Sequence, residues 1–276
     1  MTRAPSRYVH GTSAEEQDRL DLLNRILNDA SLHELALEGG ERILDFGSGL
    51  GQLTRAMAGA AGPSGRAVGI ERSQEQIAGA LRLAEQAGDS DRVEFRQGDV
   101  FEPPLRENEW GTFDVAHTRF LLEHVPDPLR VVRTMVRSVR PGGRVVLADE
   151  DHDVLRLWPE PAGVEALWRA YIETYTRAGN DPYVGRRLPQ LLHEAGALPR
   201  RSHWIWFGGC AGMERFPLLV ENMATILEGA REEIRAGGKL DAAAIDRALS
   251  AFRAWGKRPD AALWFAMAWV EGVRPG

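Results

Sequence analysis

Hydrophobic positions in the first half of the chain follow two periods in turn. Short apolar runs of strand length recur between residues 40 and 150, and several are separated by stretches with apolar residues three and four positions apart. The first pattern is typical of buried strands and the second of helices that cover a sheet. The expected strands cover residues 42–46, 66–71, 93–97, 110–117 and 144–150. Five such units in succession predict an α/β fold with a doubly wound parallel sheet and right-handed crossovers.

The segments on either side of this core have other patterns. Ser13 and Glu16 form a capping box that begins a helical segment over 13–36. After Glu150 the pattern predicts helices over 161–179, 185–195, 213–236 and 242–255, and strands over 202–207 and 262–270. We therefore expect four parts: a helical lid (1–40), a core (41–150), a cap with the last crossover helix (151–200), and final strands (201–276) with a helical insertion at about 213–258.

The first expected strand runs into a glycine-rich turn. Gly47, Gly49 and Gly51 follow it with the spacing G-x-G-x-G. Glycines allow a sharp turn and let a ligand lie against bare backbone. The dinucleotide fingerprint has the longer spacing G-x-G-x-x-G and binds a pyrophosphate. Asp45, just before this turn, would repel a phosphate but could hold an ammonium group directly or through water. The alternative interpretation of the three glycines is an ordinary tight turn between a strand and a helix.

Acidic residues also follow the second and third strands. Glu71 stands about 20 residues beyond the glycines, where a carboxylate can accept hydrogen bonds from two ribose hydroxyls. Asp99 follows Gly98 after the third strand. The carboxyl ends of parallel strands meet at one edge of the sheet, and ligands of such folds bind there. These acids and the glycine turn are therefore expected around one ligand.

On these motifs the sequence resembles the class I S-adenosylmethionine-dependent methyltransferases. The resemblance is carried by the glycine turn, by Gly98-Asp-Val100, by Glu123-His-Val125 and by the Arg-Pro-Gly-Gly turn at 140–143. It covers residues 40–150 closely and the ends loosely. It implies a Rossmann-like, seven-stranded, mostly parallel sheet with an antiparallel last strand, plus a helical lid and helical insertions. It also implies S-adenosylmethionine as cofactor and S-adenosylhomocysteine as its product.

The resemblance further implies a set of cofactor contacts. Glu71 would bind the ribose, Gln76 and Asp99 would lie against the adenine, and Val100 would offer its backbone N–H to the ring. Tyr8 would lay its ring over the sulfonium, or would simply belong to a loose tail. The implied cofactor-binding residues are Tyr8, Asp45, Gly47, Gly49, Gly51, Gln52, Glu71, Arg72, Gln76, Asp99, Val100 and His117.

Methyl transfer needs a base only when the acceptor carries a proton, and histidine suits that role near neutral pH. His117, His124 and His152 are the candidates, with His124 preferred and a structural histidine as the alternative. Arg119 would hold an acidic acceptor. The acids around His152 suggest a metal cluster. However, Thr118 and Arg119 stand where similar quinone-pathway enzymes have acids, so no metal is predicted.

Composition limits the partners. Of 276 residues, 43% are hydrophobic and 27% are charged. The net charge of −6 argues against a protein whose main function is to bind nucleic acid. No run of about 18 apolar residues is present, so no membrane span is expected. The single cysteine, Cys210, excludes an internal disulfide and fits a reducing, cytoplasmic compartment. A homodimer is compatible with the sequence.

The second half carries seven of the eight tryptophans. Such side chains are common in apolar pockets, so an apolar or aromatic acceptor is expected. The tryptophans of the last strands are expected to pack there instead: Trp204, Trp206, Trp264 and Trp269.

The sequence is compatible with three functions. The first is methyl transfer to O, N or C of a small, apolar or aromatic metabolite of the natural-product type. The second is a methyltransferase-fold protein that uses the bound cofactor without redox chemistry for cyclisation or isomerisation. The third is a non-catalytic binding protein.

Overall fold

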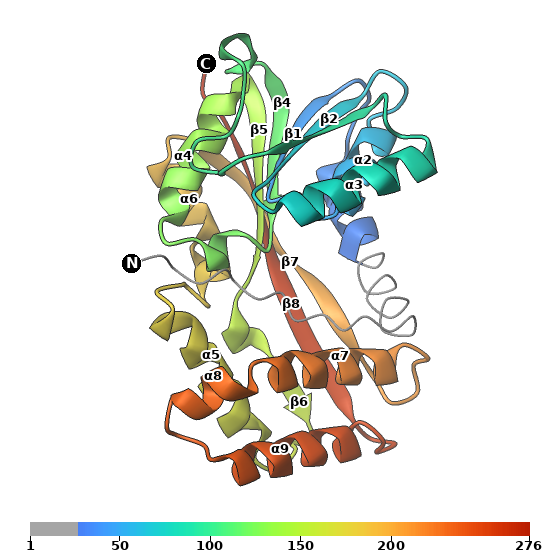
Figure 1. The fold of residues 1–276 in the computed structure, drawn as a ribbon, viewed down its shortest axis with the longest axis vertical. Coiled ribbons are helices and arrows are strands. Elements are labelled where there is room, and N and C mark those ends of the chain that lie inside the picture. Colours follow the sequence, from blue (N-terminus) through green and yellow to red (C-terminus); the bar gives the residue numbers. More distant parts are fainter. Residues whose placement is uncertain (1–26) are drawn as a thin grey trace. The chain divides into compact units, whose positions relative to one another are not determined.

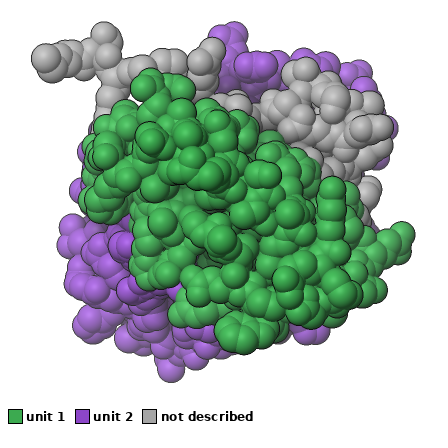
Figure 2. All heavy atoms as spheres, turned by 90° about the horizontal axis from the view of Figure 1, so that it is seen from below, with its two compact units in different colours: residues 1–27, 154–178, 206–265 green, residues 28–153, 179–205, 266–276 purple. Residues whose placement is uncertain are grey.

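The computed structural model describes residues 27–276, so the expected contact of Tyr8 and the capping box at Ser13 lie outside the described residues. The chain forms two compact units, coloured separately in Figure 2. The core unit contains residues 28–153, 179–205 and 266–276. The outer unit contains residues 154–178 and 206–265. Each unit is thus assembled from segments that are far apart in the sequence.

Five parallel strands form the centre of the core unit (Figure 1). They are β1 (Arg42–Phe46), β2 (Arg66–Glu71), β3 (Val93–Gln97), β4 (Phe113–Arg119) and β5 (Val139–Glu150). Their order is β3-β2-β1-β4-β5, so the strand order reverses between β1 and β4. In open α/β sheets this switch point is where ligands bind, outside the carboxyl ends of the strands.

Three further strands extend the sheet. β8 (Ala262–Val273) pairs antiparallel with β5, and β7 (Leu198–Cys210) pairs with β8. Residues 262–264 of β8 also pair with the short strand β6 (Arg156–Trp158). The α/β fold class, the mostly parallel sheet and its antiparallel end are confirmed. The sheet has eight strands and not seven, because β6 forms within the segment expected to be a helical cap.

Several helices begin at the capping residues that the sequence shows. In the core unit they are α2 (Gln52–Ala60), α3 (Gln74–Ala87), α4 (Pro128–Ser138) and α6 (Leu188–Glu194). Ser73 caps α3 and Asp127 caps α4, each accepting a hydrogen bond from a backbone N–H of the first turn. Residues 27–35 are also helical. The outer unit holds α5 (Val164–Arg177), α7 (Phe216–Gly229), α8 (Arg231–Ala236) and α9 (Ala242–Trp255).

Several expected boundaries differ from those of the structure by a few residues, and two of the differences change an element. The single helix expected over 213–236 breaks at Ala230 into α7 and α8, although the apolar period continues across the break. The fifth strand begins at Val139, so that the Arg-Pro-Gly-Gly turn lies within β5. Among residues 27–276, no helix combines the length and the apolar character that crossing a membrane requires.

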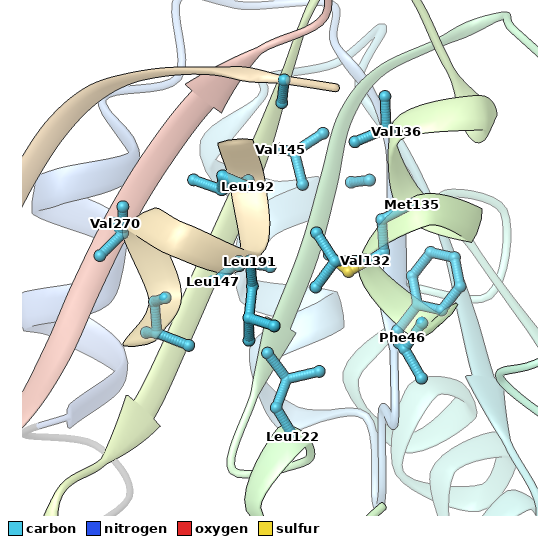
Figure 3. Close-up of a cluster of buried hydrophobic side chains, with 14 of the residues drawn as sticks. Phe46, Leu122, Val132, Met135, Val136, Val145, Leu147, Leu191, Leu192 and Val270 are labelled. Atoms are coloured by element: carbon cyan, nitrogen blue, oxygen red, sulfur yellow. The ribbon is translucent and has the colours of Figure 1, made fainter. Parts of the chain in front are cut away.

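One face of the central sheet carries the main hydrophobic cluster (Figure 3). Leu44 and Phe46 of β1 meet Val132 and Met135 of α4 and Leu191 of α6 in this cluster. Because side chains alternate along a strand, the residue between Leu44 and Phe46, Asp45, points to the other face. The fold therefore buries a carboxylate beneath the loop that follows β1.

The expectation for the late tryptophans holds for two of the four. Trp269 is fully buried and Trp204 packs against the main cluster. Trp206 and Trp264 are 62% and 46% exposed, so the expectation was wrong for them. Their neighbours Phe207 and Phe265 contact each other, with ring centroids 5.1 Å apart. Alternation along a strand predicts which residues share a face, but not which face is covered.

We predict that Gly51→Ala destabilises the protein by roughly 2 kcal/mol or more. Gly51 has φ 71°, and a Cβ there would lie 2.2 Å from the ring atom Cζ of Phe95. Gly59→Ala in α2 is the matched control, because a Cβ there meets nothing within 4 Å. That variant should gain roughly 0.5–1 kcal/mol. Urea titrations of both variants measure the difference, and equal stabilities would contradict the prediction.

Candidate functional site

The loop between β1 and α2 presents bare backbone. Gly47, Gly49 and Gly51 all have positive φ. The N–H groups of Gly47 and Ser48 donate to the carbonyl of Ile70 at 2.9 and 3.0 Å, which fastens the loop to β2. A Cβ on Gly47 would lie 3.2 Å from Leu121, and one on Gly49 would lie 3.0 Å from the side-chain oxygen of Gln76. These neighbours leave little room for a side chain at Gly47 or Gly49, and we call the bare backbone of residues 47–51 the glycine cradle.

Glu71 stands beside this cradle at the end of β2. Its Oε2 accepts a hydrogen bond from the Gly49 N–H at 3.2 Å, and its Oε1 accepts one from the Ser73 N–H at 2.8 Å. Two backbone donors thus fix the carboxylate, while a carboxylate has about four acceptor positions in all. Glu71 can therefore still accept two hydroxyls from a ligand. The structure brings Glu71, Gln76 and the glycine loop together.

Four other residues expected to contact the cofactor are exposed or partly buried. Asp99 is exposed, and its Oδ1 accepts a hydrogen bond from the Phe101 N–H at 2.9 Å, as a turn aspartate does. Val100 is partly buried against the main cluster. Gln52 begins α2 and is half-buried. Arg72 is exposed, and its carbonyl accepts a hydrogen bond from Gln97 at 3.3 Å.

Asp45 and His117 form a buried pair at the switch point. They face each other in the register of β1 and β4. The Nδ1 of His117 lies 2.8 Å from Oδ1 of Asp45, and the hydroxyl of Thr54 donates to Oδ2 of Asp45 at 2.5 Å. Asp45 is 4% exposed and His117 is fully buried. Both carboxylate oxygens therefore have partners inside the protein, a pairing that the sequence interpretation missed.

Arg119 binds the helix over residues 27–35. Its guanidinium donates to Oδ1 of Asn28 at 2.7 Å and to the hydroxyl of Ser31 at 3.3 Å. Arg144 holds the same helix by donating to the carbonyl of Leu35 at 2.7 Å. We expected Arg119 to hold an acidic acceptor, but the structure engages its guanidinium with this helix.

The turn after β4 is clamped to the end of β5. The Oδ2 of Asp149 accepts hydrogen bonds from the N–H groups of Leu121 and Leu122 at 3.2 and 2.7 Å. Its Oδ1 accepts a third from the N–H of Glu150 at 3.0 Å. Phe120, at the start of the turn, has a φ of 54°, a backbone conformation that costs energy in a non-glycine residue. These contacts fix the short helix Leu122–His124.

Glu123 in this turn bridges two histidines. Its Oε2 lies 2.9 Å from Nε2 of His152, and its Oε1 lies 3.3 Å from Nε2 of His124. Glu123 and His152 are buried, whereas the side chain of His124 is 45% exposed. His124 is therefore the member of this group that a substrate in solution can reach.

A metal ion could also bind here. Single ligand atoms of Glu123, Glu150 and His152 all lie within 4.8 Å of one another. Imidazole and carboxylate ligands suit several divalent cations. The two aspartates that the sequence suggested beside His152, Asp151 and Asp153, instead accept hydrogen bonds from Arg186. Glu123 lies 29 residues from His152, so no local spacing reveals that they meet.

Burial shifts the pKa values in this group strongly. It raises the pKa of Glu123 to about 8, and burial together with repulsion from Glu123 raises the pKa of Glu150 to about 8. The pKa of Asp149 is also raised, chiefly by burial. Partial burial, followed by the charges of His152 and Arg72, lowers the pKa of His124, and burial lowers the pKa of His152. Near pH 7 the group thus combines protonated carboxyls with neutral imidazoles, as acid–base sites do.

Comparisons with known proteins identify relatives of this chain. A family model described as a methyltransferase domain matches residues 16–198. The chain is 32% identical over 235 residues to 27-O-demethylrifamycin SV methyltransferase of Amycolatopsis mediterranei (strain S699), covering 83% of this chain and 81% of that protein. It is 33% identical over 202 residues, 71% of its length, to an uncharacterized 37.1 kDa protein in transposon TN4556 of Streptomyces fradiae. The chain spans 56% of the length of that relative.

A solved structure with a similar fold is the [4+2]-cyclase SpnF. The TM-score is 0.57 at 22% sequence identity, with 90% of this chain and 80% of that chain covered. A likeness at this identity concerns the fold alone.

We predict that the protein loses stability as the pH rises from 6 to 9. Glu123 and Glu150 have a pKa of about 8 in the folded protein against a usual 4.5, so folding takes up protons between these values. The stability that depends on these protons is complete below about pH 4.5 and is lost as the pH rises through 8. Between pH 6 and 9 the loss is on the order of 3 kcal/mol per carboxyl.

Thermal melts at pH 6, 7, 8 and 9 measure this slope. Glu123→Gln should flatten it, because the amide cannot ionise. Glu102→Gln serves as control, since the Glu102 side chain is 83% exposed. A Glu123→Gln slope equal to that of the wild type would show that the buried carboxyls do not titrate in this range.

Proposed function

The chain belongs to the class I S-adenosylmethionine-dependent methyltransferases, and from this premise we propose that it methylates a hydroxyl group of a small, apolar or aromatic metabolite. The observation that carries the proposal is the glycine cradle with the Glu71 carboxylate fixed beside it by two backbone N–H groups. A hydroxyl acceptor is favoured because Glu123 and His124 offer the base that only a protonated acceptor needs. The relative from Amycolatopsis is named for an O-methylation.

S-adenosylmethionine, when bound, supplies a methyl group made electrophilic by the sulfonium. The protein's own part begins with binding. Glu71 would accept the ribose hydroxyls, and the glycine loop would admit the nucleoside against its backbone. Gln76, Arg72, Asp99, Val100 and Gln52 would border the nucleoside.

His124 is the proposed general base. Its imidazole takes the hydroxyl proton, while Glu123 orients the ring and, in its ionised form, stabilises the imidazolium that forms. His152 holds the other oxygen of Glu123 at 2.9 Å, so the carboxyl cannot rotate away. The lowered pKa of His124 keeps the ring neutral at pH 7, so that it can accept a proton. An ionised Glu123 makes the same ring a stronger base.

Cyclisation or isomerisation on the same fold is not favoured. The likeness to the cyclase SpnF is one of fold at 22% identity, whereas the relative at 32% identity is named as a methyltransferase. Incubation with methyl-labelled cofactor and a panel of phenols, hydroxylated polyketides and 27-O-demethylrifamycin SV separates the functions. Label transferred to an acceptor supports the proposal, and an isomeric product without label overturns it.

We predict that Glu71→Gln weakens the binding of S-adenosylhomocysteine by roughly 10- to 100-fold, because hydrogen bonds to a charged group contribute about 1.5–3 kcal/mol. Glu75→Gln, in the exposed first turn of α3, should leave the affinity unchanged. Calorimetric titration measures both. If the wild type binds NAD and ignores S-adenosylhomocysteine, the proposed cofactor is wrong.

We also predict that His124→Gln lowers kcat by roughly 100-fold or more while leaving the cofactor affinity near that of the wild type. His193→Gln, on an exposed position of α6, is the control. In the wild type kcat should rise roughly tenfold as the pH passes 8, because ionised Glu123 strengthens the base. Glu123→Gln should remove this rise. Stopped assays with the acceptor found in the panel measure kcat, and a His124→Gln value within threefold of the wild type would exclude this base.

A further inference from the structure

One face of the sheet in the outer unit carries three exposed tryptophans. Trp158 of β6, Trp264 of β8 and Trp206 of β7 are 67%, 46% and 62% exposed. Their strands are neighbours, because β8 pairs with both β6 and β7 (Figure 1). Single apolar side chains at a surface are normal, but a group of them marks a surface that contacts something else. Three tryptophans on adjacent strands therefore need an explanation.

The pairing of β6 with β8 puts Trp158 and Trp264 on the same face. The register places Arg156 opposite Trp264, and Trp158 opposite Ala262. Residues that lie opposite each other in a ladder point to the same side of the sheet, and so do residues two positions apart along one strand. Trp158 and Trp264 are therefore diagonal neighbours on this face.

The opposite face of the same strands is covered by a helix, which shows where Trp206 points. The ring of Phe265 lies 5.1 Å from that of Phe207 and 5.9 Å from that of Trp168 in α5, measured between centroids. Because successive side chains alternate, Trp206 and Trp264, each next to one of these phenylalanines, point away from α5. We call the surface formed by Trp158, Trp206 and Trp264 the tryptophan face.

The composition of the tryptophan face differs from that of a sheet face in water. An antiparallel sheet with one covered face normally alternates apolar residues inward with polar residues outward. The outward positions of β6 and of the part of β8 that pairs with it are Arg156, Trp158, Ala262 and Trp264. Only one of these four residues is charged, and none is acidic. The partner that complements such a face is a second apolar surface and not a charged one.

The exposed area is large enough for the centre of a dimer interface. An aromatic side chain can bury roughly 150–250 Å², so the exposed parts of the three indoles amount to roughly 400 Å². That is about half of the roughly 800 Å² that each partner buries in a stable complex. Tryptophan is also among the residues that contribute most to binding when it lies at the centre of such an interface.

We propose that the tryptophan face is the contact between two copies of this chain related by a two-fold axis. Such an axis brings the same patch of both copies together, so each copy offers the other an apolar surface of equal size. Removing both faces from water at once supplies the driving force. The inference does not depend on the proposed function, because it concerns a surface of the outer unit and not the cofactor.

The test is sedimentation velocity over a range of protein concentrations. The wild type should sediment as a dimer at micromolar concentration. Trp206→Thr and Trp264→Thr should each raise the dissociation constant of the dimer by roughly 30-fold or more, because a two-fold contact loses each indole twice. Threonine suits an exposed strand position, and thermal melts check that both variants fold. Leu81→Gln, at a 51% exposed position of α3, is the control and should leave the dissociation constant unchanged.

A measurement on the unmodified protein covers the case in which a variant does not fold. Quenching of the tryptophan fluorescence by acrylamide should decrease as the wild type is concentrated through the range in which it dimerises. A wild type that stays monomeric overturns the inference, and so does a dimer that persists when all three tryptophans are replaced by threonine. A monomer that binds phosphatidylglycerol vesicles through these indoles also overturns it, because the partner is then a lipid surface.

Discussion

The structure around the switch point depends on one constraint: a carboxyl group taken out of water must receive hydrogen bonds or keep its proton. Three acids, two near the ends of central strands and one in the turn after β4, meet this constraint in different ways. Asp149 receives three backbone N–H groups, Asp45 receives an imidazole and a hydroxyl, and Glu123 receives two imidazoles. Each solution also fixes a neighbouring segment, so that the polar groups and the loops around them are positioned together.

These three arrangements differ in whether their members can still change protonation state or accept a further hydrogen bond. The backbone donors around Asp149 are fixed by the fold, so this carboxylate serves to hold the turn after β4. The histidine partners of Glu123 can give up or take protons, so this group can take part in chemistry. The pair of Asp45 and His117 is intermediate, since the carboxylate is saturated while the ring retains one open position.

Much of the fold follows from the sequence, because its signals are local. The apolar runs predicted the five parallel strands, and the glycine turn and Glu71 fell at adjacent strand ends as expected. The family suggested by these motifs was confirmed. What the sequence did not reveal are contacts between distant segments. Arg119 meets Asn28 across 91 positions, and the packing that leaves Trp206 exposed depends on which face of β7 is covered.

The interleaving of the two units has an evolutionary consequence. The chain passes between them near residues 153, 178, 205 and 265, and β7 and β8 each contribute residues to both. No single recombination event can therefore exchange the outer unit for that of another protein while leaving the core unit intact. New specificity in such an architecture has to arise by substitutions in place, within strands whose register the core already dictates.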